Sequence, residues 1–234
     1  LTAIGYAGAV VMLLRLDHRD PRRAAGAPGI FASLAEGFST LRQNRTLLGI
    51  LVVTVIFNIW GFPFTSMVPV IGKDVLDLGP GAVGFLASAE GAGAFFGAII
   101  LAMFAVARWF RALYFYGVGA YLVFIVVFGL SGQTWISAPA LVLAGVAGAA
   151  FASMQSALVL INSGEADKGR MMGVLSMCIG TGLIGFFHLG LLADWIGASN
   201  ACVVIGLEGA VALLVAGWFW PELLKAQPRG PVEV

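Results

Sequence analysis

The sequence predicts an all-α, polytopic membrane protein: a bundle of six transmembrane helices in two inverted three-helix repeats, preceded by the end of a truncated helix. Of the 234 residues, 60% are hydrophobic and 11% charged, with a mean hydropathy of +0.97. Soluble domains instead hold about 45–50% apolar and about 25% charged residues. Six apolar runs each reach the length of about 20 residues that a bilayer crossing needs. The alternating segments of about ten residues that mark membrane-spanning strands are absent.

The first apolar run, Leu1 to Leu14, is too short to span a bilayer. It also lacks the basic leading region and small-residue cleavage site of a signal peptide. We interpret it as the end of a truncated transmembrane helix and expect the N-terminal part of the protein to be missing. The predicted units are a helix remnant at 1–16, a cytoplasmic loop between two larger units at 17–45, a six-helix unit at 46–220 and a cytoplasmic tail at 221–234.

Basic residues support the number of spans. The six runs cover 46–71, 82–105, 112–131, 136–161, 171–193 and 200–220. If each run crosses the bilayer, all of the 13 basic residues except Lys73 fall on one side. Because Lys and Arg concentrate in cytoplasmic loops, this side is predicted to be the cytoplasm, and the C-terminus lies there. We expect a multi-pass protein of a bacterial inner (plasma) membrane.

A weak internal repeat links the second and fifth runs. Many transporters are built from inverted three-helix repeats. Here Gly84-Phe85-Leu86 and Gly91-Ala92-Gly93 match Gly173-Val174-Leu175 and Gly180-Thr181-Gly182 at a constant offset. Three intervening helices would place the two copies in opposite orientations. The alternative is coincidence, because the chain contains 32 glycines, and small residues also serve close helix packing.

Several stretches together resemble the C-terminal half of the major facilitator superfamily, particularly its enterobactin and macrolide exporter-like branch. They are Leu41-Arg42-Gln43-Asn44-Arg45, Phe57-Asn58-Ile59-Trp60-Gly61-Phe62-Pro63-Phe64, Lys73-Asp74-Val75-Leu76, Lys168-Gly169-Arg170-Met171-Met172-Gly173 and Gly190-Leu191-Leu192-Ala193-Asp194-Trp195-Ile196-Gly197. The resemblance covers helices seven to twelve of that family and the end of helix six. The family's basic loop motif after helix eight is reduced to Ala107-Arg108-Trp109-Phe110-Arg111.

The resemblance implies a secondary active transporter that exports small amphipathic organic compounds, drug-like or siderophore-like, by proton antiport. Its partners would be the small-molecule substrate, protons, the lipid bilayer and the missing N-terminal half, with no nucleic acid, no cofactor and no metal. The 46–71, 82–105, 136–161 and 171–193 helices would line a central cavity, while the 112–131 and 200–220 helices would face lipid. Lys168 and Arg170 would belong to a cytoplasmic gating loop.

Ionisable residues inside apolar helices are functional candidates because burying charge in hydrocarbon is costly. Glu90 is the first candidate for proton coupling or substrate binding, since its helical neighbours Gly93, Ala94 and Gly97 are small and leave room for protein or a cavity. The alternative is a structural hydrogen bond. For Glu208, which has bulky apolar neighbours, and for His188, near a helix end, we expect structural roles.

Uncharged residues of the cavity helices are further candidates. Asn58 and Gln155, in the first helix of each triplet, either contact substrate or bond between helices. Trp60 and Phe62, together with Phe64, suit an amphipathic organic substrate. Pro63 and Pro69 interrupt the backbone hydrogen bonds of the 46–71 helix, which makes them candidate hinge residues.

Two other classes of protein are alternatives. Ser131 and His188 resemble the serine and histidine of a rhomboid-like intramembrane protease, where they would act as nucleophile and base. Ser131 lies in a short external loop, however, and the rest of the chain does not match that family. A noncatalytic membrane assembly protein or receptor is the other alternative. We therefore expect a transporter that is not an enzyme.

Overall fold

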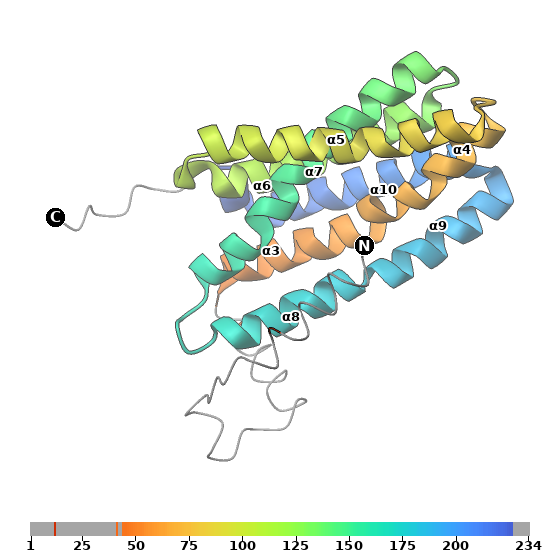
Figure 1. Cartoon of the computed structure of the whole chain (residues 1–234). Coiled ribbons are helices and arrows are strands. Elements are labelled where there is room, and N and C mark those ends of the chain that lie inside the picture. Colours follow the sequence, from red (N-terminus) through yellow and green to blue (C-terminus); the bar gives the residue numbers. More distant parts are fainter. Residues whose placement is uncertain (1–11, 13–40, 42–43, 227–234) are drawn as a thin grey trace.

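The protein forms a bundle of six helical spans in a computed structural model that describes residues 12, 41 and 44–226 (Figure 1). The predicted all-α membrane fold is confirmed, because each of the six spans is long and apolar enough to cross a bilayer. Almost all of the two units predicted at 1–16 and 17–45, and the last residues of the predicted tail, lie outside the described residues.

The spans begin and end close to the predicted positions. The first span combines α3 (Arg45–Ile56), η2 (Phe57–Gly61), η3 (Phe62–Met67) and α4 (Val68–Asp74). The second is α5 (Pro80–Phe104), the third is η4 (Ala107–Trp109) with α6 (Phe110–Leu130), and the fourth is α7 (Thr134–Asn162). The fifth consists of α8 (Lys168–Gly180) and α9 (Gly182–Ile196), and the sixth is α10 (Ala198–Phe219), followed by η5 (Pro221–Leu223).

The first span changes helix type midway. Phe57–Gly61 forms a π-helical turn and Phe62–Met67 a 3₁₀ helix that contains Pro63. Proline cannot donate a backbone hydrogen bond, so Pro63 removes one bond from the regular helical ladder. The Phe62 carbonyl accepts a hydrogen bond from Thr65 Oγ1 (3.0 Å), and the Pro63 carbonyl accepts one from Ser66 Oγ (2.8 Å). The interruption predicted around Pro63 is present, and two local hydroxyl groups bond to carbonyls within it.

The fifth span is interrupted at Thr181, where the sequence predicted one continuous helix. α8 ends at Gly180 and α9 begins at Gly182, so the break lies between two residues of low helix propensity. The Thr181 hydroxyl donates to the Cys178 carbonyl at 2.6 Å. Such a bond from a side chain back to the preceding turn competes with the regular helical ladder.

The repeated glycines have matching surroundings in the two triplets. A Cβ atom added at Gly93 of α5 would meet the backbone of Val142 in α7, and one added at Gly182 would approach the backbone of Asn58 in the first span. Each glycine therefore approaches the first helix of the other triplet. The remaining matched glycines face open space in both copies: Gly84 and Gly91 in α5, Gly173 and Gly180 in α8. These contacts support the predicted repeat.

Two spans are poorly covered by the rest of the bundle. Only 17% of the most apolar stretch of α5 and 28% of that of the α8–α9 span are buried, compared with 67% for the first span. In Figure 1, α5 lies along one edge of the bundle and α8 and α9 along the opposite edge. The first span and α7 lie between them, and together with α6 they supply most of the buried aromatic and aliphatic side chains.

Candidate functional site

Two glycines of α7 allow α5 and α6 to approach the centre of the bundle. A Cβ atom at Gly145 would lie 2.0 Å from the backbone oxygen of Glu90. One at Gly148 would lie 3.0 Å from the ring of Tyr121. Both distances are closer than ordinary van der Waals contact, so only glycine fits without displacement at the first position. The spacing Gly-x-x-Gly in α7 therefore lets the backbone of Glu90 and the ring of Tyr121 pack against this helix.

Glu90 and Tyr121 form a hydrogen-bonded pair inside the bundle. The Tyr121 hydroxyl donates to Glu90 Oε1 at 2.7 Å. Glu90 lies ten residues after the start of α5 at Pro80, roughly 15 Å along the helix at about 1.5 Å per residue. The Tyr121 side chain is almost completely buried, and its ring packs on Phe57 and Phe64. The carboxylate is thus held at mid-span by a hydroxyl group whose ring cannot readily move.

The pair borders a cavity of about 350 Å³. This volume is within the range of about 300–1,000 Å³ that is typical of small-molecule sites. Apolar and aromatic groups form most of its wall, with four polar side chains among them. The cavity brings together four of the predicted candidates, namely Glu90, Asn58, Gln155 and Phe62.

Tyr121 is a site residue that sequence reasoning missed. It belongs to the 112–131 run, whose helix was predicted to face lipid, yet this residue lines the cavity. The prediction for this helix is therefore wrong at this position. A hydroxyl group in the middle of an apolar run was the available signal, because such a group needs a partner in hydrocarbon.

A second polar network adjoins the cavity at Gln155. Thr54 Oγ1 lies 2.7 Å from the Tyr114 hydroxyl, and both oxygens lie within hydrogen-bonding distance of the Ile50 carbonyl oxygen, at 3.1 and 2.9 Å. Gln155 Nε2 donates to Thr54 Oγ1 at 3.4 Å, which joins α7 to α3 and α6. Gln155 therefore makes an interhelical bond and also borders the cavity. In contrast, the Asn58 amide donates to the Thr54 carbonyl of its own span at 2.9 Å.

Two aromatic candidates lie outside this cavity. Trp60 Nε1 donates to Glu208 Oε2 at 3.0 Å, and His188 Nε2 lies 2.8 Å from the same oxygen. Trp60 lines a different hollow with both of these residues. Phe64 is fully buried against Tyr121, so it is not available to a substrate. The aromatic residues that looked like one group in the sequence are separated because they lie on different sides of the irregular first span.

The remaining predicted residues have local partners. Lys168 Nζ lies 2.5 Å from Glu165 Oε1, and Arg170 Nη1 lies 2.8 Å from Asp167 Oδ1, each within one helical turn. Ser131 Oγ donates to the Gln133 carbonyl. Since His188 is bonded to Glu208, the Ser131–His188 pair that a protease would require is not formed.

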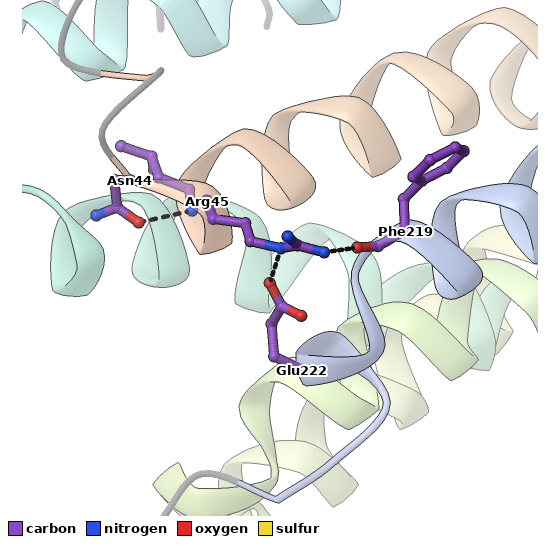
Figure 2. A network of polar contacts seen from close by, with 5 residues as sticks. Asn44, Arg45, Phe219 and Glu222 are labelled. Carbon is purple, nitrogen blue, oxygen red and sulfur yellow. Dashed lines mark hydrogen bonds and ion pairs between the residues drawn. The ribbon is translucent and has the colours of Figure 1, made fainter.

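Polar contacts also join the helix ends on the predicted cytoplasmic side. Arg45 at the start of α3 forms an ion pair with Glu222 at 3.3 Å and donates to the Phe219 carbonyl at the end of α10 (Figure 2). Asn44 caps α3 by accepting from the Leu47 amide, and its own amide donates to the Asn162 carbonyl of α7 at 2.8 Å. The start of the six-span unit is thus attached to the ends of α7 and α10.

Comparison with known proteins agrees with this architecture. No curated protein matches the chain. The model of the Major Facilitator Superfamily matches residues 1–184, which include the first four spans and much of the fifth. Because this match covers well over half of the 234 residues, the chain, a multi-pass helical membrane protein, belongs to the major facilitator superfamily of transporters.

Proposed function

We propose that the chain forms part of a secondary active transporter that exports small amphipathic organic compounds, drug-like or siderophore-like, by proton antiport. The observation that supports this proposal most directly is the Glu90–Tyr121 pair in the wall of an apolar, mid-span cavity. A carboxyl group there can be neutral when protonated and charged when it releases the proton. Proton binding and substrate binding can then exclude one another, so that substrate binding releases the proton.

The cavity chemistry fits an amphipathic substrate. Phe57, Phe62 and Phe151 provide aromatic surface, and the amides of Asn58 and Gln155 provide hydrogen-bonding groups. Ligand sites commonly combine an apolar wall with a few fixed polar groups that orient the ligand. The Asn58 and Gln155 amides would orient the substrate, while Glu90 would carry the proton.

A second bundle would complete the cavity. The open glycines of α5 and α8 lie on the two least buried spans, and small residues allow helices to pack closely. We propose that the six-helix unit at 46–220 packs through this surface against an N-terminal half of the same protein. Alternating access would arise when the two halves rock about the shared cavity.

Other parts of the chain would serve the transport cycle. The π-helical and 3₁₀ turns around Pro63, together with Pro69, would act as a hinge in the first span. Lys168 and Arg170 would belong to a cytoplasmic gating loop, and residues 221–234 to a cytoplasmic tail. The distribution of basic residues supports this orientation in a bacterial inner membrane.

Reconstitution of the complete protein in liposomes tests the proposal. Suitable probes are ethidium, a macrolide antibiotic and a catecholate siderophore. A pH gradient should drive transport of at least one probe by the wild type. Glu90→Gln should abolish this driven transport but retain exchange of labelled for unlabelled probe, which needs no net proton movement. Failure to transport any of the three probes would contradict the proposed substrate class, and driven transport by Glu90→Gln would contradict the role of Glu90.

A further inference from the structure

We propose that Glu208 forms a second ligand site, which binds a lipophilic organic cation between η2, α9 and α10. This site is separate from the Glu90 cavity. Only the role of this site in a transport cycle rests on the proposed function. Binding at Glu208 itself requires nothing outside the described bundle.

The Glu208 carboxylate is held at mid-span. It lies ten residues after the start of α10 at Ala198, roughly 15 Å from that end at about 1.5 Å per residue. Trp60 Nε1 and His188 Nε2 both contact Oε2, at 3.0 and 2.8 Å. Within the described part of the chain, Oε1 has no hydrogen-bond partner. One oxygen therefore fixes the group in place, and the other is available to a ligand.

The surroundings favour a cation with apolar substituents. The hollow at Glu208 has a volume of about 560 Å³, and its wall includes Ile59, Ile184, Phe187 and Leu191. Glu208 keeps 40% of its side-chain surface exposed there. When His188 is neutral, the carboxylate has no counter-charge in these apolar surroundings. It then gains most from a positive charge that brings little hydration with it, since burying an uncompensated charge is costly. The indole of Trp60 adds an aromatic surface to which a cation is attracted.

Trp60 also adjoins a second cavity. This strongly apolar cavity of about 670 Å³ lies between α3, α8 and α10. The Glu90 cavity shares none of its lining residues with the hollow at Glu208, so the two carboxylates do not form one site.

Direct binding of tetraphenylphosphonium to the full chain in nanodiscs of zwitterionic lipid tests the proposal. Glu208→Gln, which keeps the shape of the side chain, should weaken binding at least about tenfold, or about 1.4 kcal/mol. Asp194→Asn removes a carboxylate from α9 outside the hollow and should leave the affinity unchanged. Tetraphenylborate has the same shape and the opposite charge, and its binding should not decrease in Glu208→Gln.

Chemical labelling gives a second readout that does not depend on the folding of a variant. Dicyclohexylcarbodiimide should modify Glu208 in the wild type, and tetraphenylphosphonium should slow this reaction. Equal affinity in the wild type and Glu208→Gln, or labelling that the cation does not slow, would overturn the proposal. Loss of binding in Glu90→Gln with none in Glu208→Gln would place the cation in the Glu90 cavity, which contradicts this inference but not the proposed transport function.

Discussion

The Tyr121 hydroxyl lies 2.7 Å from Glu90 Oε1, which joins α6 to α5 across the centre of the bundle. Tyr121→Phe removes only this donor and keeps the ring that packs on Phe57. We expect gradient-driven transport to slow by about tenfold without being abolished, because a hydrogen bond to a charged group contributes about 1.5–3 kcal/mol. Initial rates in proteoliposomes provide the measurement. A rate equal to that of the wild type would show that the hydroxyl does not assist Glu90.

Gly145 controls how closely α5 and α7 approach. Gly145→Ala would place a methyl group 2.0 Å from the Glu90 backbone oxygen, so the helices must separate. Overpacking of this kind costs about 1–3 kcal/mol, and we expect a lower midpoint in thermal unfolding of the detergent-solubilised protein. Gly190→Ala in α9 is the matched control, since a Cβ there meets nothing within 4 Å. Equal midpoints for the two variants would contradict the close crossing.

The Arg45–Glu222 pair connects the start of the six-span unit to the segment after α10 (Figure 2). The Arg45 side chain is 70% exposed, and exposed ion pairs contribute only about 0.2–1 kcal/mol. A double-mutant cycle of Arg45→Ala and Glu222→Gln should therefore give a coupling energy below about 1 kcal/mol. Arg45→Ala alone should destabilise more than Glu222→Gln, because it also removes the bond to the Phe219 carbonyl. The opposite order would contradict the double role of Arg45.

Membrane orientation can be tested with single cysteines in a background without Cys178 and Cys202. Cysteines at Gly132, in the loop before α7, and at Ala198, the first residue of α10, should react with an impermeant thiol reagent added outside intact cells. Cysteines at Gly26 and Gly164 should not, because basic residues concentrate on the cytoplasmic side. Gly26 lies outside the described residues, and Gly164 lies in the loop before α8. Reversed labelling would contradict the proposed orientation.

The sequence was sufficient to predict the spans because hydrocarbon imposes a simple length and composition requirement. All six described spans lie where the apolar runs placed them. The break at Thr181 and the π-helical turn before Pro63 were not predicted at that detail. Both depend on local side-chain hydrogen bonds and helix propensities. These leave the hydropathy of an apolar run almost unchanged.

The site was only partly predictable. Glu90, Asn58, Gln155 and Phe62 meet in one cavity as expected for polar and aromatic groups on the cavity helices. Trp60 faces Glu208 instead, because the irregular turns of the first span direct neighbouring residues to different sides. Helical spacing alone cannot show which of several apolar faces turns inward. Contacts between distant helices, such as that of Gly148 with Tyr121, decide this point.

Proton release on substrate binding tests the role of Glu90 most directly. The complete protein is purified in weakly buffered detergent, and the probe that the transport assay identifies is added while pH is recorded. We predict that the wild type and the distant control Glu222→Gln release protons to the same extent. Glu90→Gln, which carries no titratable carboxyl group at this position, should release markedly fewer. Equal proton release by the wild type and Glu90→Gln would contradict proton coupling through Glu90 and leave that residue as a structural partner of Tyr121.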